Sequence, residues 1–342
     1  MRILVTGGAG YIGSHTLVAL LEKGYELVVY DNLVNATIDN IKRVEELTGK
    51  CVRFVQGDIR DIQALDSLFA EEKVETVIHF AALKAVSESV NQPLSYYQNN
   101  VHGTFCLLEA MQKARVNNFI YSSSATVYGE SNPSPYNETM VLGSPSSPYG
   151  AGKVMIERVL GDIAKINSDF RCISLRYFNP IGAHRSGRIG NDSRGIPNNL
   201  LPYITQVAIG QRDQLNVYGG DYPTLDGTCV RDYLHVMDLA EGHVAALTWL
   251  KGHPDFIGLE PFNLGAGKGI SVLDIISSFV KATDIEVPYI IVERRLGDLP
   301  SFWADPTKAK NLLGWQAERT LDEMMIDAWH WQLQNSNSFS YP

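Results

Sequence analysis

A glycine-rich turn between a short apolar run and a helical pattern constrains the fold of this chain more than any other stretch. Residues 2–6 read RILVT, and TGGAGYIGSH follows with Gly7, Gly10 and Gly13 at every third position. Such a turn needs glycine to bend tightly, to let the backbone approach a pyrophosphate and to pack a helix closely on a strand. The helix that starts there offers free N–H groups and a positive dipole end to phosphates. The stretch therefore predicts a βα turn that binds a dinucleotide.

An acidic residue at the end of the next predicted strand indicates which dinucleotide is bound. The strand LVVYD ends at Asp31, 18 residues after Gly13. A carboxylate at this point accepts hydrogen bonds from the adenosine ribose and repels a 2′-phosphate, so NAD is favoured over NADP. Asp58 follows the third predicted strand and is expected either to contact the adenine or to serve as a turn residue.

The first half of the chain alternates short β-branched runs with helical patterns. Strands are expected over 2–6, 27–31, 52–58, 76–81, 119–123 and 172–177, with long helices over 92–114 and 149–166. This alternation is typical of an α/β fold with a Rossmann-type doubly wound parallel sheet. Beyond residue 180 the chain changes to Gly-, Asn- and Pro-rich loops with separate helices. We therefore predict an NAD-binding domain over 1–180 and a smaller C-terminal α/β substrate domain over 181–342.

Composition narrows the choice of partners and of compartment. A net charge of −9 over 342 residues argues against nucleic acid or an anionic membrane as the main partner. The cysteines form no CxxC pair, so neither a metal site nor a disulfide framework is expected; they are Cys51, Cys106, Cys172 and Cys229. MRILVTGG leads directly into a strand, leaving no room for a signal peptide, and no apolar run reaches the roughly 18 residues of a membrane span. These features predict a cytoplasmic protein.

The stretch SPYGAGK places Tyr149 and Lys153 one turn apart at the start of a helix. Oxidation of an alcohol by a nicotinamide needs a base for the hydroxyl proton, but tyrosine titrates near 10. Lowering its pKa to about 7 requires about 4 kcal/mol of differential stabilisation, which a neighbouring ammonium favours. At i and i+4 the two side chains share one helix face. The small residues between them are expected to let a cofactor approach this turn closely.

A run of serines strengthens the prediction of a catalytic site. SSSATVYG follows the fifth predicted strand, so Ser122, Ser123 or Ser124 would face the crevice at the carboxyl edge of the sheet, where ligands bind in such folds. A hydroxyl at this position can relay a proton between a substrate and Tyr149.

The motifs together make the chain similar to the extended short-chain dehydrogenase/reductase family, and within it to the 4-epimerases of UDP-hexoses. The resemblance covers nearly the whole chain and rests on GGAGYIGSH, YDNL, GDIRD, HFAALKAVSES, NNVHGT, SSSATVYG, SPYGAGK, RYFNPIGAH, GIPNNLLPY, YPTLDGTCVRDYLHVMDLA, FNLGAGKGISVLD and RRLGDLPSFWAD. One departure is Gly152, where relatives usually carry Ser or Thr. The resemblance implies interconversion of UDP-galactose and UDP-glucose through a transient 4-keto sugar, with Tyr149 as acid and base and a tightly bound, recycled NAD. It also implies a homodimer formed through the helices of 92–114 and 149–166.

The resemblance assigns roles to individual residues. It implies Ser124, Tyr149 and Lys153 as the catalytic set. These three, the glycines of the first turn and the following residues are implied to surround NAD: Tyr11, Ile12, Asp31, Asn32, Asn35, Asp58, Ile59, Phe80, Ala81, Lys84, Asn99 and Phe178. A cation at Lys84 could also meet phosphate on chemical grounds, because FAALKA follows a strand.

A nucleotide sugar brings a diphosphate, which an acidic protein must meet with local cations. Arg231 and Arg295 are the candidates, since the guanidinium fork matches phosphate oxygens. By resemblance the UDP site of the second domain is completed by Asn179, Asn199, Leu200, Asn216, Tyr218, Tyr233 and Asp298. Tyr218 could stack on uracil. Phe302 occupies a position that in relatives influences the room for an N-acetyl group, and its bulk predicts poor activity on UDP-N-acetylglucosamine.

Three alternatives remain at this stage. A nucleotide-sugar 4,6-dehydratase shares the Tyr-Lys pair, but it needs an Asp-Glu pair where this chain has Ala125 and Thr126. A 4-epimerase of another UDP-sugar, such as a UDP-N-acetylhexosamine, UDP-pentose or UDP-hexuronate, is harder to separate by sequence. The non-enzymatic alternative is an NAD-binding sensor protein of Rossmann type, which typically lacks the Tyr-Lys pair.

Overall fold

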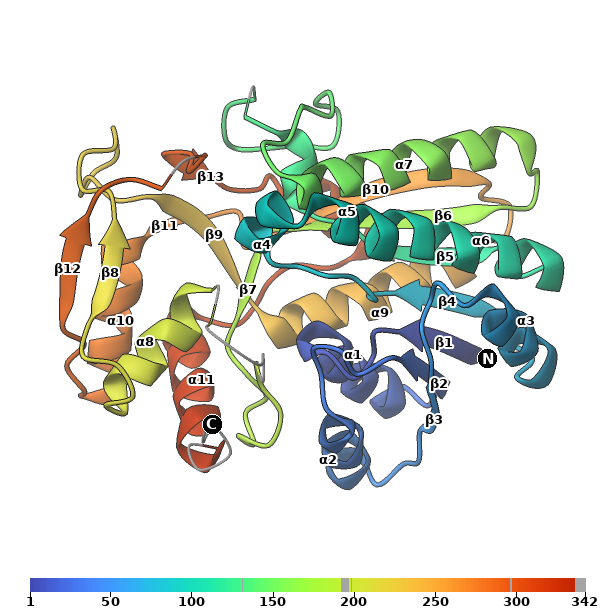
Figure 1. Cartoon of the computed structure of the whole chain (residues 1–342), viewed down its shortest axis with the longest axis horizontal. Coiled ribbons are helices and arrows are strands. Elements are labelled where there is room, and N and C mark those ends of the chain that lie inside the picture. Colours follow the sequence, from blue (N-terminus) through green and yellow to red (C-terminus); the bar gives the residue numbers. More distant parts are fainter. Residues whose placement is uncertain (131, 192–196, 198, 296, 336–342) are drawn as a thin grey trace.

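Six strands of the first half and one strand of the second half, β10, form one parallel sheet of seven strands (Figure 1). The computed structural model describes residues 1–130, 132–191, 197, 199–295 and 297–335. The strand order is β10-β6-β5-β4-β1-β2-β3, and all neighbours are parallel. The strands are β1 (Arg2–Thr6), β2 (Glu26–Asp31), β3 (Arg53–Gln56), β4 (Thr76–His79), β5 (Asn118–Ser122), β6 (Arg171–Tyr177) and β10 (Gly258–Leu264). The predicted Rossmann-type doubly wound sheet is confirmed.

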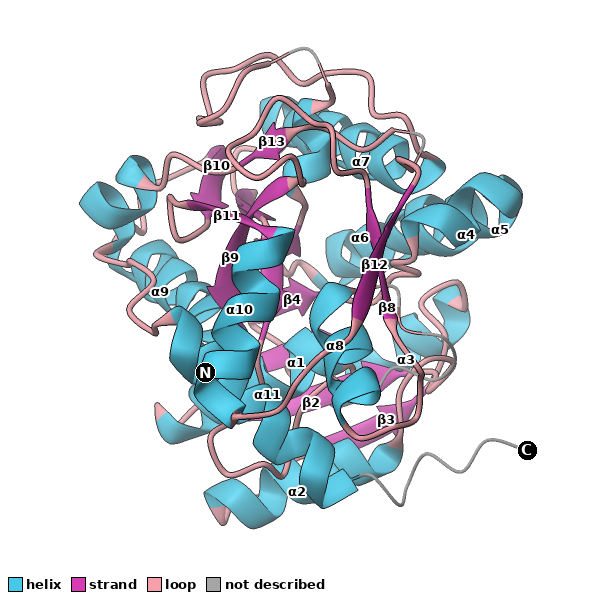
Figure 2. Cartoon of the chain, turned by 90° about the vertical axis from the view of Figure 1, so that its left-hand side faces the viewer, coloured by secondary structure: helices cyan, strands magenta, loops and turns pink. Residues whose placement is uncertain are grey.

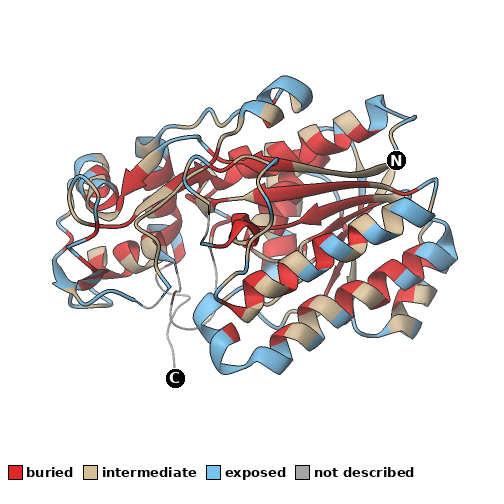
Figure 3. Cartoon of the chain, turned by 90° about the horizontal axis from the view of Figure 1, so that it is seen from above, coloured by how far each residue is buried: buried red, intermediate tan, exposed pale blue. Residues whose placement is uncertain are grey.

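Helices cover both faces of this sheet. They are α1 (Tyr11–Glu22), α2 (Ile38–Thr48) and α9 (Val236–Gly252) on one face, and α3 (Ile62–Glu71), α6 (Gly103–Ala114) and α7 (Pro148–Ile166) on the other. In β1, Ile3 and Val5 join the core beneath α1 and α9, whereas Leu4 joins the core beneath α3 and α6, as the two-residue period of a strand requires. Figure 3 shows the sheet buried between helices whose outer faces are exposed. Among the described residues no helix is long and apolar enough to cross a bilayer.

The segment predicted as one helix over 92–114 is less regular than expected. It consists of α5 (Pro93–Tyr96), the π-helical turn η1 (Tyr97–His102) and α6, and it follows α4 (Val86–Asn91). The side chain of Asn100 in η1 donates to the Leu83 carbonyl and accepts from the Leu83 amide, each at 2.8 Å. These two hydrogen bonds hold the turn close to the loop that follows β4. Short π-helical turns are frequent at functional sites.

The second half of the chain builds a smaller lobe beside the large sheet (Figure 2). Its strands are β7 (Asn179–Ile181), β9 (Val230–His235), β11 (Gly269–Ser271) and β13 (Ser301–Phe302) in one sheet, and β8 (Leu215–Tyr218) and β12 (Tyr289–Val292) in another. Its helices are α8 (Leu200–Ala208), α10 (Val272–Thr283) and α11 (Leu321–Asn335). The short turns η2 (Ala125–Tyr128) and η3 (Ala309–Leu313) complete the chain. The boundary at residue 180 stays a prediction; α9 and β10, which follow it, pack with the large sheet.

A buried carboxylate holds three segments of the smaller lobe together. Asp232 on β9 is fully buried and accepts hydrogen bonds from the backbone amides of Ala266, Gly267 and Ala304, at 2.7, 3.0 and 3.0 Å. Burial raises the pKa of this carboxyl to about 6, although the three amides favour the charged form. Asp232 therefore joins β9 to the loop after β10 and to the residues that follow β13.

We expect Asp232→Ala to lower the free energy of unfolding by about 3 kcal/mol or more, because it leaves three backbone donors without their acceptor. Urea unfolding measures this loss. Asp305→Ala is the matched control: Asp305 lies near β13 and accepts an exposed bond from the Thr307 amide, so it should cost less than about 1 kcal/mol. Equal losses in the two variants would contradict this role for Asp232.

Candidate active site and dinucleotide pocket

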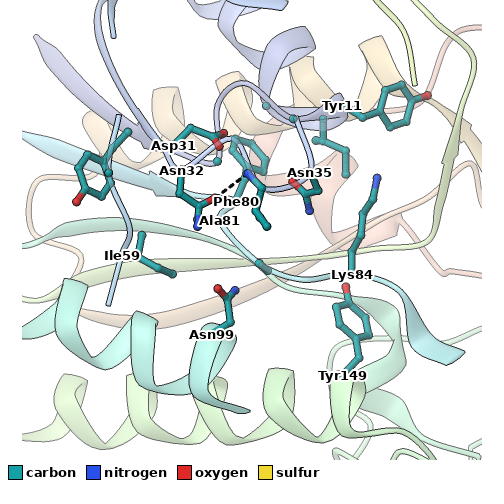
Figure 4. Close-up of a pocket in the computed structure, with 18 of the residues that line it drawn as sticks. Tyr11, Asp31, Asn32, Asn35, Ile59, Phe80, Ala81, Lys84, Asn99 and Tyr149 are labelled. Carbon is teal, nitrogen blue, oxygen red and sulfur yellow. Dashed lines mark hydrogen bonds between the residues drawn. The ribbon is translucent and has the colours of Figure 1, made fainter. Parts of the chain in front are cut away.

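A pocket opens at the carboxyl ends of β1, β2 and β4, where ligands bind in doubly wound sheets (Figure 4). Fifteen of the predicted cofactor residues line it: Gly7, Gly10, Tyr11, Ile12, Gly13, Asp31, Asn32, Asn35, Ile59, Phe80, Ala81, Lys84, Asn99, Tyr149 and Lys153. Figure 4 shows Tyr149 reaching into this pocket from α7 and Asn99 from the π-helical turn. The structure thus brings the predicted dinucleotide residues and the Tyr-Lys pair into one cavity.

The glycine turn leaves the start of α1 free for an anion. Gly10 is the N-cap of α1 and makes no side-chain cap hydrogen bond, so the amides of the first turn face the pocket unpaired. Gly7 has a φ of 70°, and a Cβ there would lie 2.5 Å from the backbone nitrogen of Ala81. A Cβ at Gly13 would lie 2.4 Å from the Gly7 carbonyl oxygen. These contacts explain the glycines, and the uncapped helix end fits a pyrophosphate.

The two predicted acidic residues of the cofactor site differ in their surroundings. Asp31 is buried at the pocket wall and accepts from the amides of Ala9 and Leu33, at 3.0 and 2.9 Å. Burial raises the pKa of its carboxyl. Asp58 instead binds the Arg60 guanidinium, which holds its pKa below the usual range. It lies outside the residues that line the pocket, whereas its neighbours Gly57 and Ile59 line it.

The helix α7 begins at the predicted cap, and its two early glycines differ in their surroundings. Ser147 caps the helix by accepting from the Gly150 amide at 3.2 Å. A Cβ at Gly150 would lie 2.6 Å from Pro145 Cβ, so this glycine lets α7 start close to the preceding loop. A Cβ at Gly152 would lie 3.4 Å from Val101 Cγ2, an ordinary van der Waals contact. The expectation that these small residues let a cofactor approach stays a prediction.

Burial is the largest influence on the pKa values of Tyr149 and Lys153. Lys153 is 5% exposed, and its Nζ donates to the Ser122 carbonyl at 2.6 Å. Burial lowers the pKa of this ammonium to about 7, and the negative charge of Glu157 opposes that shift. Burial raises the pKa of the Tyr149 phenol, which a hydrogen bond with Ser124 lowers. The Lys153 Nζ lies 5.8 Å from the centre of the Tyr149 ring.

The three serines after β5 take three separate roles. Ser122 Oγ lies 2.6 Å from the Tyr177 hydroxyl, and Ser123 Oγ donates to Glu157 at 2.6 Å. Ser124 is the N-cap of η2 and bonds with Tyr149. Of the three serines, Ser124 is thus the one next to the phenol, and its role as a proton relay stays a prediction.

Tyr177 is a pocket residue that the sequence analysis missed. It ends β6 and lines the cavity beside Tyr149 and Lys153. Its signal was its position at the carboxyl end of a predicted strand, immediately before Phe178. Phe178 and Ser124, two of the predicted NAD residues, lie outside the residues that line the pocket.

The predicted substrate residues gather in the smaller lobe. Asp298 pairs with Arg231 at 3.3 Å and with Arg295 at 3.0 Å, and the Arg295 guanidinium lies 4.7 Å from the centre of the Tyr218 ring. The others lie on elements of this lobe: Asn179 opposite Tyr233 in the β7–β9 pair, Asn216 on β8, and Asn199 and Leu200 at the start of α8. Among the described residues no group of three His, Cys, Asp or Glu could hold a metal ion.

Phe302 stands in an aromatic cluster at this side of the site. Its ring centre lies 4.6 Å from that of Tyr136 and 5.1 Å from that of Phe178. Its backbone pairs with Arg231 in the β13–β9 ladder. Phe302 thus contacts both Arg231, a predicted diphosphate residue, and Phe178, a predicted NAD residue.

Comparisons with known proteins agree with this geometry. The family model described as GDP-mannose 4,6 dehydratase matches residues 4–328. The UDP-glucose 4-epimerase of Erwinia amylovora is 57% identical over 335 residues, which is 98% of each chain. The crystal structure of the Bifidobacterium longum UDP-glucose 4-epimerase with NAD+ and UDP has a TM-score of 0.95 at 46% identity, covering 99% of this chain and 100% of that one. The Stenotrophomonas maltophila UDP-glucose 4-epimerase, with bound NAD and formylated UDP-arabinopyranose, has a TM-score of 0.95 at 45% identity over 99% of each chain.

We expect Gly13→Ala to weaken dinucleotide binding by about 1–3 kcal/mol, because the new methyl group overlaps the backbone of the glycine turn and pushes α1 away. The measurement is the amount of NAD that stays with the protein through gel filtration. Gly161→Ala serves as control: Gly161 lies in α7, with Leu259 Cδ2 3.9 Å away, so alanine fits and should slightly favour the helix. Wild-type NAD content in Gly13→Ala would refute the packing argument.

Proposed function

Because this chain belongs to the UDP-glucose 4-epimerase family of extended short-chain dehydrogenases/reductases, we propose that it interconverts UDP-galactose and UDP-glucose. The observation that carries the proposal is the position of Tyr149 and Lys153 at a dinucleotide pocket, with Ser124 next to Tyr149. A binding protein has no need of a buried lysine and a buried phenol beside each other, since both cost desolvation. The alternative of an NAD-binding sensor is therefore disfavoured.

NAD is the cofactor, and the described residues fit it. The uncapped first turn of α1 suits the pyrophosphate, and Asp31 suits the hydroxyls of the adenosine ribose. Lys84, whose Nζ lies 6.0 Å from the centre of the Tyr11 ring, supplies a cation to the same cavity. When bound, the nicotinamide supplies a hydride acceptor that returns to its starting state. We therefore expect the dinucleotide to copurify with the protein.

Tyr149 acts as the base and the acid of the reaction. Its oxygen takes the proton of the sugar 4-hydroxyl, and Ser124, which bonds with it, relays that proton. The Lys153 ammonium, held by the Ser122 carbonyl, stabilises the phenolate through its charge. Loss of the hydroxyl proton and of hydride leaves a 4-keto sugar, and Tyr149 returns the proton after hydride is delivered to the opposite face.

The second lobe holds the nucleotide while the hexose turns over. Arg231 and Arg295 both form an ion pair with Asp298, so their two guanidinium groups lie close together. We expect them to bind the diphosphate through charge-assisted hydrogen bonds. The Arg295 guanidinium lies over one face of the Tyr218 ring, and we expect the other face to stack on the uracil. A firm hold on the diphosphate and few polar contacts to the hexose would let the 4-keto sugar present either face.

A 4-epimerase of another UDP-sugar is the second candidate. The Stenotrophomonas maltophila relative was crystallised with a UDP-pentose derivative, so a pentose substrate has specific support. UDP-hexuronates and UDP-N-acetylhexosamines belong to the same reaction type. Phe302, packed between Tyr136 and Phe178, favours the unacetylated sugars.

We also propose a homodimer, as the resemblance implies. Val90 of α4, Leu94 of α5 and Met155 of α7 are 58%, 74% and 47% exposed. The three helices pack against one another, so these side chains form an apolar surface that a second copy could cover. The predicted compartment is the cytoplasm.

The first test is to incubate the purified protein with UDP-galactose without added NAD and to separate the sugars by chromatography. We expect an equilibrium mixture with UDP-glucose. Tyr149→Phe should lower turnover about a thousandfold while its NAD content stays unchanged, since only the base is lost. Parallel incubations with a UDP-pentose and a UDP-hexuronate identify the second candidate. Absence of any product with NAD supplied would refute epimerisation, and full turnover by Tyr149→Phe would place the base elsewhere.

A further prediction concerns the N-acetyl group of the sugar. The unchanged protein should turn over UDP-N-acetylglucosamine poorly, and Phe302→Ala should raise its kcat/KM relative to UDP-glucose by about tenfold or more. The smaller residue removes a ring that fills the space between Tyr136 and Phe178. Phe302→Tyr keeps the ring and serves as control. Comparable turnover of acetylated and plain substrates by the unchanged protein would contradict this assignment.

A further inference from the structure

A buried ion pair lies directly behind the Tyr149–Lys153 pair and has no part in the chemistry described above. Glu157 follows Lys153 by one turn of α7, and Arg176 precedes Tyr177 at the end of β6. The two side chains are 2% and 6% exposed, and Arg176 Nη2 donates to Glu157 Oε2 at 2.6 Å. Buried ion pairs add little net stability, because both groups lose their hydration. Its position next to the catalytic pair indicates another role.

The Glu157 carboxylate fixes the strand end that carries the serines. Its Oε1 accepts from Ser123 Oγ at 2.6 Å and from Ser174 Oγ at 2.8 Å. Ser123 stands between Ser122, whose carbonyl accepts from Lys153, and Ser124, which bonds with Tyr149. By holding Ser123, the Glu157 carboxylate therefore fixes the positions of Ser122, which contacts Lys153, and of Ser124, which contacts Tyr149.

Glu157 also places a negative charge next to Lys153. Arg176 pairs with the carboxylate at 2.6 Å; desolvation lowers the pKa of the Lys153 ammonium, and the negative charge of Glu157 raises it. Burial favours the neutral forms of the other titratable groups around these two side chains, which are His79, Tyr121, Cys172 and Tyr177; Tyr149 is the phenol on which Lys153 acts. From other elements packed on α7, Glu88 bonds to Tyr96 and Glu260 pairs with Lys308.

We propose that Glu157, paired with Arg176, is a positioning residue that keeps Lys153 protonated and aligned for Tyr149. Its catalytic consequence rests on the proposed function, whereas its effect on Lys153 does not. Without the charge of Glu157, Lys153 would lose its proton at lower pH. A neutral Lys153 stabilises the phenolate less, so the loss of activity grows as the pH rises through the titration of Lys153.

The direct test follows Lys153 by NMR. The purified holoenzyme is labelled with ¹³C at lysine Cε, the Lys153 signal is assigned through Lys153→Met, and its titration midpoint is measured. We expect Glu157→Gln to lower the midpoint by about one pH unit. Ser174→Ala is the matched control, because it removes one hydrogen bond to the same carboxylate and leaves its charge; its midpoint should stay at the wild-type value.

A double variant covers the case in which Glu157→Gln does not fold, since that change leaves Arg176 buried without its counterion. Glu157→Gln with Arg176→Met removes both charges, and replacing a whole buried pair is far better tolerated than breaking it. The midpoint of Lys153 should still fall, because the negative charge is gone. An unshifted midpoint in the folded variant overturns the proposal.

Activity provides a second, separate readout. The pH profile of kcat for UDP-galactose should lose its basic limb at lower pH in Glu157→Gln, and Ser174→Ala should keep the wild-type shape. A lowered midpoint with an unchanged profile overturns the catalytic role. If the wild-type protein turns over no UDP-sugar, the proposed function fails, while the NMR midpoint still decides the effect of Glu157 on Lys153.

Discussion

The arrangement of the site depends on one buried contact, in which the Lys153 ammonium donates to the Ser122 carbonyl between α7 and β5. An ammonium group out of water is costly unless it finds acceptors and negative charge. Here the carbonyl at the end of β5 provides the acceptor, and Glu157, one turn further along α7, provides the charge. The contact ties α7 to the carboxyl edge of the sheet. Tyr149, one turn before Lys153, thereby faces the cavity that the strand ends create.

The two sides of the site are built in different ways. On the dinucleotide side, backbone packs directly on backbone, with Gly7 against Ala81 and Gly13 against Gly7. The glycine turn therefore has little room to move. The other side is held by the shared pairing of Arg231 and Arg295 with Asp298, in which the Arg231 and Asp298 side chains are 16% and 19% exposed and the Arg295 side chain is 57% exposed. An ion pair with one exposed partner is weak, so Arg295 can exchange Asp298 for another anion at small cost. Arg231, which is largely buried, stays in place.

Local sequence patterns predicted the parts of this protein that local physics determines. The two-residue period of Ile3, Leu4 and Val5, the glycines of the first turn and the Tyr-Lys spacing each depend on neighbours within a few residues. Other features depend on chain segments far apart. Asp232 reads as part of a motif until three distant amides meet its carboxylate. The pairing of β10 with β6 and the Glu157–Arg176 pair likewise become visible only when helix and strands are packed together.

The same scaffold can support elimination as well as epimerisation, so the choice between them must lie in side chains rather than in the fold. The family model that matches this chain carries the description of a dehydratase, GDP-mannose 4,6 dehydratase. A dehydratase eliminates water, for which it needs an acid and a base directly after the strand-end hydroxyl. In this chain Ala125 is 2% exposed in the first turn of η2, and Thr126 turns its hydroxyl back to Ser124 at 3.0 Å. A carboxylate at 125 would be buried, and one at 126 would displace the hydroxyl that bonds to Ser124. The turn that places Ser124 next to Tyr149 thus leaves no room for the carboxylate pair that an elimination needs.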